Sequence, residues 1–160
     1  MFARLPDEID PLRLADEGRA LDGELSAGNF KRLSGVVGPV TVALRFERTA
    51  HGTRHLRGTI KAQVETTCQR CLETITLRLE ATPDVELATS EPSAGAQDEA
   101  DTLVVTGRWL LQEYVEDELL LVMPMIPAHT ESPCRALPPG LEPTNTGRQP
   151  VAGLGRNQKQ

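Results

Sequence analysis

Hydrophobic and polar residues alternate along three segments in the first half of the chain, each time with a period of two. The positions between the hydrophobic ones carry mostly Thr, Arg, Lys, Gln and Glu. This pattern is typical of antiparallel strands that bury one face and expose the other. The inward positions are predicted to be Val40, Val42, Leu44 and Phe46, then Ile60, Ala62, Val64 and Thr66, then Ile75, Leu77 and Leu79. Three such strands share an apolar face, and that face needs a cover.

A helical period replaces the alternation near residue 110 and predicts that cover. Hydrophobic residues recur there at steps of four, four and three, as they do along one face of a helix. We expect the helix to begin near residues 106–108 and to end before Pro124, because proline lacks an amide hydrogen and disfavours helix in the residue before it. The apolar stripe consists of Leu111, Val115, Leu119 and Val122, widened by Leu110, Tyr114 and Leu120, with Glu113, Glu116 and Asp117 expected outside it.

The remaining segments give weaker patterns. Residues 1–27 mix acidic residues with scattered Leu and are interpreted as an extended or partly helical lead-in, and residues 88–101 as an exposed loop. Beyond Cys134 the chain is Pro, Gly and polar residues, which bury too little surface to offset the entropy of ordering. We therefore predict an α+β domain over residues 1–135, with an antiparallel sheet of at least three to four strands under one main C-terminal helix. A disordered tail is predicted over residues 136–160.

Composition narrows the class of protein. Of the 160 residues 39% are hydrophobic but only 3% aromatic, so the core must consist of Val, Leu and Ile. No stretch approaches the ~20 apolar residues that cross a membrane. Asp7 and Glu8 fall where a signal peptide would show its apolar segment. The sequence predicts a cytoplasmic protein without a membrane partner.

Charge is distributed unevenly. The net charge of −6 argues against a general nucleic-acid coat, because nonspecific binding depends on neutralising phosphates. Residues 28–80 nevertheless carry nine Lys or Arg against four acidic residues, whereas residues 81–134 carry one Arg against eleven acidic residues. This asymmetry indicates either a binding polarity, with a basic and an acidic half for different partners, or two differently solvated faces.

The three cysteines are the candidate chemistry. Cys68 and Cys71 form a Cys-x-x-Cys pair between two predicted strands, and with His129 and Cys134 they make a complete Cys3His set for one structural zinc ion. A redox pair is the second interpretation, although this Cys-x-x-Cys opens a strand rather than a helix. The third is that the cysteines are small hydrophobic residues and His129 is an ordinary loop histidine. The sequence leaves all three open.

Two blocks of sequence resemble a known family. Cys68-Gln69-Arg70-Cys71-Leu72, followed about forty residues later by the segment from Tyr114 to Cys134, resembles the YceD family of large ribosomal RNA subunit accumulation proteins. The resemblance implies a role in accumulation or processing of large-subunit ribosomal RNA, with no established catalytic activity. The positions that match the family motif are Cys68, Gln69, Arg70, Cys71, Leu72, Glu116, Glu118, Leu121, Pro124, Pro127, His129 and Cys134.

The resulting hypothesis is a non-enzymatic ribosome biogenesis factor that binds precursor large-subunit ribosomal RNA or a ribosomal protein, with no evident small-molecule substrate. The alternative is a thiol-based redox or zinc-dependent regulator that uses Cys68 and Cys71. A hydrolase built on the acidic helix is disfavoured, because neighbouring helical positions point about 100° apart and their carboxylates do not converge. The predicted contacts with RNA or a protein partner are Arg45, Arg54, Arg57, Lys61 and Arg78.

Overall fold

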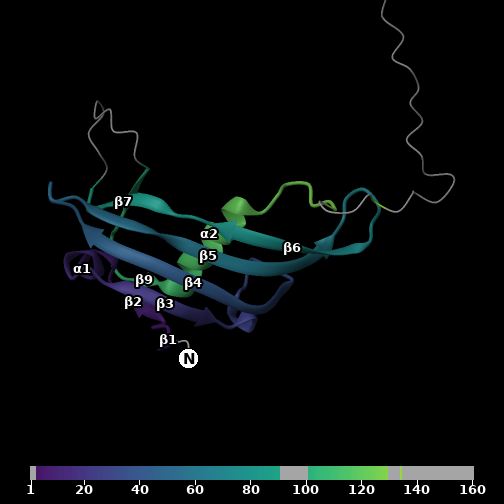
Figure 1. The fold of residues 1–160 in the computed structure, drawn as a ribbon, viewed down its shortest axis with the longest axis horizontal. Coiled ribbons are helices and arrows are strands. Elements are labelled where there is room, and N and C mark those ends of the chain that lie inside the picture. Colours follow the sequence, from purple (N-terminus) through teal and green to yellow (C-terminus); the bar gives the residue numbers. More distant parts are fainter. Residues whose placement is uncertain (1–2, 91–100, 130–133, 135–160) are drawn as a thin grey trace, which may run out of the picture.

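The computed structural model describes residues 3–90, 101–129 and 134, and it places the three alternating segments side by side in one sheet (Figure 1). They form β4 (Val36–Arg48), β5 (Arg54–Thr67) and β6 (Thr74–Ala81), which pair antiparallel. The register sets Val42 opposite Ile60 and Val64 opposite Leu77, so the inward positions of the three strands coincide. These positions are buried except Thr66, which is half-buried. The predicted half-buried antiparallel sheet is confirmed.

Shorter strands extend this sheet to seven strands within the described residues. On one side, β3 (Ala20–Leu25) pairs antiparallel with β4 and β1 (Ala3–Arg4) pairs parallel with β3. On the other side, β7 (Asp84–Ala88) pairs antiparallel with β5, and β8 (Thr102–Val104) pairs parallel with β7. β6 and β7 both pair with β5, one after the other along its length.

Gly58 lies where β5 changes partner from β7 to β6. Its N–H donates to the carbonyl oxygen of Pro83 at 3.1 Å, within the link between β6 and β7. A Cβ at this position would lie 2.2 Å from the backbone oxygen of Ala43 on β4. Only glycine lets the three segments approach this closely.

The two α-helices in the described ranges lie on the apolar face of the sheet. α2 (Leu111–Val122) packs against β5 and β6, and its stripe residues Leu111, Val115 and Leu119 are fully buried. α1 (Pro11–Asp16) packs against β4 and β5 at the other end of the sheet (Figure 1). The predicted helical cover is confirmed. No helix in the described ranges is long and apolar enough to cross a membrane.

Three expectations need correction. α2 begins at Leu111 rather than near residues 106–108, because Trp109–Leu110 forms a short strand, β9, paired antiparallel with β2 (Glu8–Ile9). The lead-in is more regular than predicted: it contributes β1, β2, α1, β3 and a 3-10 turn at Ala27–Asn29. At the two ends of the predicted stripe, Leu110 and Val122 are exposed. The predicted tail, and residues 91–100 of the predicted loop, lie outside the described residues.

Candidate metal centre

The Cys-x-x-Cys motif forms a tight turn between β5 and β6. The N–H of Cys68 donates to the carbonyl oxygen of Glu73 at 2.8 Å, and the N–H of Leu72 donates to that of Cys68 at 2.9 Å. Leu72 has a φ of 61°, in the left-handed region that L residues other than Gly, Asn and Asp seldom adopt. We call this turn, residues 68–73, the knuckle. Its backbone bends back on itself, and both thiols come from one end of the hairpin.

The segment after α2 is attached to the knuckle by hydrogen bonds. The N–H of Gln69 donates to the carbonyl oxygen of Pro127 at 2.8 Å. The guanidinium of Arg70 donates to the carbonyl oxygen of His129 at 3.0 Å. Gln69 and Arg70, two of the matched motif positions, therefore link residues that are nearly sixty positions apart in sequence.

The structure brings the four predicted ligands together. Their candidate donor atoms all lie within 4.8 Å of one another. The Sγ atoms of Cys68 and Cys134 are 3.6 Å apart, and Nδ1 of His129 lies 3.5 Å from the Sγ atoms of both Cys71 and Cys134. The thiols are free, Cys68 is buried, and the other three side chains are half-buried.

The local environment favours a thiolate at Cys68. Burial raises the pKa of this thiol, but hydrogen bonds from the backbone N–H groups of Cys71, Arg70 and His129 together lower it, to about 5. At Cys71, a backbone hydrogen bond from Glu73 lowers the pKa, whereas burial and the neighbouring thiols Cys68 and Cys134 raise it above its usual value. A bound cation would relieve the repulsion among closely spaced thiolates, so the donor set suits zinc, which prefers four S and N ligands in a tetrahedron.

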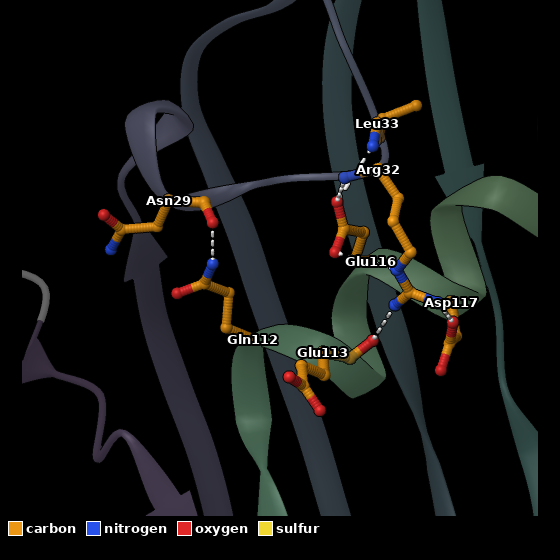
Figure 2. A network of polar contacts seen from close by, with 7 residues as sticks. All are labelled: Asn29, Arg32, Leu33, Gln112, Glu113, Glu116 and Asp117. Atoms are coloured by element: carbon orange, nitrogen blue, oxygen red, sulfur yellow. Dashed lines mark hydrogen bonds and ion pairs between the residues drawn. The ribbon is translucent and has the colours of Figure 1, made fainter.

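The sequence predicted that Glu116 lies on the solvated face of α2, and this prediction is wrong. Its side chain is only 3% exposed. Its Oε1 accepts hydrogen bonds from the N–H groups of Arg32 and Leu33 at 2.5 and 2.8 Å, and its Oε2 lies 3.3 Å from Nε of Arg32 (Figure 2). Burial alone would raise the pKa of Glu116, but these donors lower it.

Hydrogen bonds and ion pairs around Glu116 connect the 3-10 turn (Ala27–Asn29) and the loop that follows it to α2. Arg32 also pairs with Asp117 at 2.5 Å and donates to the carbonyl oxygen of Glu113, while the side chain of Gln112 donates to the carbonyl oxygen of Asn29 (Figure 2). Sequence reasoning missed this role, although a signal was present. With about 100° per residue, Glu116 lies about 40° from Leu120 and about 60° from Leu119 around the helix. It is therefore flanked by apolar positions.

The other matched positions have different surroundings. Pro127 is buried and Glu118 is half-buried. The side chains of Gln69, Arg70, Leu72, Leu121 and Pro124 are exposed. The Leu side chains at two of these positions, Leu72 and Leu121, are exposed and do not contribute to the core.

The predicted contact residues lie on opposite faces of the sheet. Arg45, Arg57, Lys61 and Arg78 fall at outward positions of β4, β5 and β6 and are exposed. Arg54 instead falls at an inward position and binds Asp16 of α1 through two hydrogen bonds, at 2.8 and 3.0 Å. Arg54 therefore lies on the opposite face of the sheet from these four outward cations.

Two of the four outward cations, Arg57 and Lys61, form ion pairs within the fold. Arg57 pairs with Asp84 at 2.9 Å and with Glu47 at 3.6 Å, and Lys61 pairs with Glu80 at 3.3 Å. Within the described part of the chain, no ion pair forms at Arg45 or Arg78. Lys61 and Arg78 line one open hollow of about 510 Å³ beside the register shift between Val37 and Thr41.

Comparisons with known proteins agree with the resemblance. The family model described as large ribosomal RNA subunit accumulation protein YceD matches residues 56–154. This match includes all four residues of the Cys3His set and extends past residue 135. A protein of Haemophilus influenzae named large ribosomal RNA subunit accumulation protein YceD is 30% identical over 146 residues, which cover 82% of this chain and 79% of the relative. No solved structure matches the chain.

Proposed function

The chain belongs to the YceD family of large ribosomal RNA subunit accumulation proteins, and on this premise we propose that it acts by binding a precursor of the large ribosomal subunit. The observation that carries the proposal of binding rather than catalysis is the Cys3His set, whose donor atoms lie within 4.8 Å of one another. Four protein ligands close a tetrahedral site, whereas catalytic zinc keeps one position open for water or substrate. A role in subunit assembly would place the protein in the cytoplasm.

The proposed ion is one structural zinc, held by Cys68, Cys71, His129 and Cys134. When bound, it would cross-link the β5–β6 hairpin to the segment that follows α2. The hydrogen bonds from Gln69 and Arg70 already hold these two parts together. The zinc would therefore stabilise one end of the molecule as a surface with a defined shape.

The redox alternative uses the same thiols and needs a direct test. Thiol titration of the native chain is expected to reveal free thiols only after a chelator removes zinc. A redox pair would instead respond to a reductant and remain indifferent to the chelator. Metal analysis of the same sample should find about one zinc per chain.

The proposed contacts with precursor RNA are the outward cations Arg45, Arg57, Lys61 and Arg78. Lys61 and Arg78 are the best placed, because both line the hollow beside the register shift and Arg78 has no ion pair among the described residues. The chain has one Trp and one Tyr, and these two rings stack on each other, so contact with phosphates is favoured over stacking of bases.

The function is tested by sedimentation of the tagged full-length chain with ribosomal particles on a density gradient. The chain is expected to migrate with large-subunit precursors and to be absent from mature small subunits. Depletion of the protein should lower the ratio of large-subunit to small-subunit ribosomal RNA. Migration only at the top of the gradient, with an unchanged ratio, would argue against the proposed function.

A further inference from the structure

An exposed apolar surface lies at the C-terminal end of α2. Four large hydrophobic side chains occur within six residues: Leu121 is 79% exposed, Val122 40%, Met125 99% and Ile126 71%. We call these four residues the apolar end. Contiguous exposed hydrophobic residues of this kind mark binding surfaces in soluble proteins more often than isolated ones do.

The apolar end is held in place rather than projecting from a loose segment. Pro127 directly follows it, is buried, and accepts the hydrogen bond from Gln69 of the knuckle. Met123, between its two halves, is half-buried against the core. On the knuckle, Leu72 is another exposed hydrophobic residue, with 71% of its surface exposed, and its backbone is fixed in the left-handed conformation. A surface fixed in this way loses little conformational entropy when a partner binds.

The segment that carries the apolar end is negatively charged, although the guanidinium of Arg70, from the knuckle, lies against the carbonyl oxygen of His129, three residues beyond Ile126. Residues 109–129 contain four acidic residues and no Lys or Arg. Arg32 compensates Glu116 and Asp117, whereas Glu118, one helical turn before Leu121 and Val122, forms no ion pair within the described ranges. The last turn of α2 also has no basic residue, so no side chain of the helix itself compensates the negative end of the helix dipole next to the exposed side chains.

We propose that the apolar end binds a basic, amphipathic protein segment. Apolar side chains of that segment would cover Leu121, Met125 and Ile126, and its Lys or Arg side chains would approach Glu118 and the last carbonyl groups of α2. RNA fits poorly, because its phosphates would meet a carboxylate and the negative end of a helix. A second copy of this chain would place like charges opposite each other across a twofold axis. The inference rests on the proposed function, since a large-subunit precursor contains basic proteins as well as RNA.

The test uses the full-length chain and two probes prepared from the same large-subunit precursors: their total extracted protein and their deproteinised RNA. The triple variant Leu121→Ser, Met125→Ser, Ile126→Ser is expected to bind the protein probe at least tenfold more weakly than the wild type, and to bind the RNA probe equally well. Leu110→Ser, 49% exposed at the opposite end of α2, is the matched control and should bind both probes like the wild type. Glu118→Lys should weaken binding to the protein probe, most clearly at low salt.

Equal binding of the triple variant and the wild type to the protein probe would overturn the inference, and so would a loss confined to the RNA probe. A wild-type dimer that the triple variant dissociates would assign the apolar end to self-association and overturn it as well. Gradient sedimentation of the wild type distinguishes failure of this inference from failure of the proposed function. If the wild type migrates with precursors but the triple variant binds the protein probe as tightly as the wild type does, only the inference fails. If the wild type does not migrate with precursors, the proposed function fails first.

Discussion

At the scale of single residues, the two polar clusters differ in the kind of group that they join: the Cys3His set consists of side chains, whereas the carboxylate of Glu116 binds backbone N–H groups. Cys68 and Cys71 lie close together in the chain, and few residue types bind zinc, so the candidate set could be recognised from residue identity and order. Glu116 could not be recognised in this way, because its partners are backbone N–H groups in the loop of Arg32 and Leu33, more than eighty positions away. Backbone donors carry no signature in the side-chain sequence.

Replacement of one ligand should reveal the proposed zinc. Cys71→Ser is expected to lower zinc content well below one ion per chain and to lower the melting temperature, because binding of a structural metal contributes directly to folding. Gln69→Ala is the control on the same turn: its backbone N–H still donates to Pro127, and its exposed side chain is not a ligand. Metal analysis and thermal unfolding measure both effects. Equal zinc content in the two variants would rule out Cys71 as a ligand.

Removal of the Glu116 carboxylate should destabilise the fold. Glu116→Ala leaves the N–H groups of Arg32 and Leu33 without their acceptor, with an expected loss of about 2–4 kcal/mol in the free energy of unfolding. Glu113→Ala, on the exposed side of the same helix, should change it by less than about 0.5 kcal/mol. Denaturant unfolding of the two variants gives the comparison, and equal stabilities would mean that the loop does not depend on Glu116.

Glu116 should also contribute to the pH dependence of stability. Its pKa is lowered in the folded chain, so the stabilisation is complete above the ordinary pKa of a Glu and is lost as the pH falls through the lowered folded value. The difference in stability between the wild type and Glu116→Gln should therefore narrow in acid. A difference that stays constant from pH 7 to pH 3 would show that ionisation of Glu116 does not stabilise the fold.

At the scale of elements, long periodic segments were predictable and short ones were not. β4, β5 and β6 each bury alternate residues, and α2 has a stripe of three fully buried residues. β1, β2 and β9 are two residues long, and no period can be read from two residues. β9 exists because β2, about a hundred positions earlier, pairs with it, and this pairing delays the start of α2 to Leu111.

The role of α2 as the cover of the sheet leads to a paired prediction on one helix. Leu119→Asp places an unpaired charge where the side chain is fully buried, and should destabilise the chain by about 3–5 kcal/mol. Leu121→Asp makes the same chemical change two residues later, where the side chain is exposed, and should cost less than about 0.5 kcal/mol. Thermal unfolding compares them. Similar melting temperatures for the two variants would contradict the position of the helix on the sheet.

At the scale of the whole molecule, the charge asymmetry along the sequence does not become two separate faces. Arg32 from the basic half binds Glu116 and Asp117 of the acidic half, and Arg57 binds Asp84. Opposite charges distant in sequence thus neutralise each other within the fold. What remains are local features: outward cations at the hollow lined by Lys61 and Arg78, and an acidic, apolar surface at the end of α2.

The proposed RNA contact at the hollow gives the prediction at this scale. The double variant Lys61→Glu, Arg78→Glu should weaken binding to precursor large-subunit RNA and reduce the dependence of affinity on salt, because each lost phosphate contact removes roughly 0.7–0.9 from the slope of log K against log salt. Stability should change little, since the exposed pair of Lys61 with Glu80 contributes at most about 1 kcal/mol.

The matched control for this variant is Arg19→Glu, Arg108→Glu, which changes the net charge by the same amount. Arg19 and Arg108 line a different hollow, beside α1, and Arg108 pairs with Glu8 as Lys61 pairs with Glu80. Filter binding to precursor RNA at several salt concentrations measures affinity and slope for both variants. If both lose affinity equally, the effect is one of net charge and not of the hollow. If neither does, Lys61 and Arg78 do not contact RNA, and contact with the precursor must come from another surface, with the apolar end of α2 as the leading candidate.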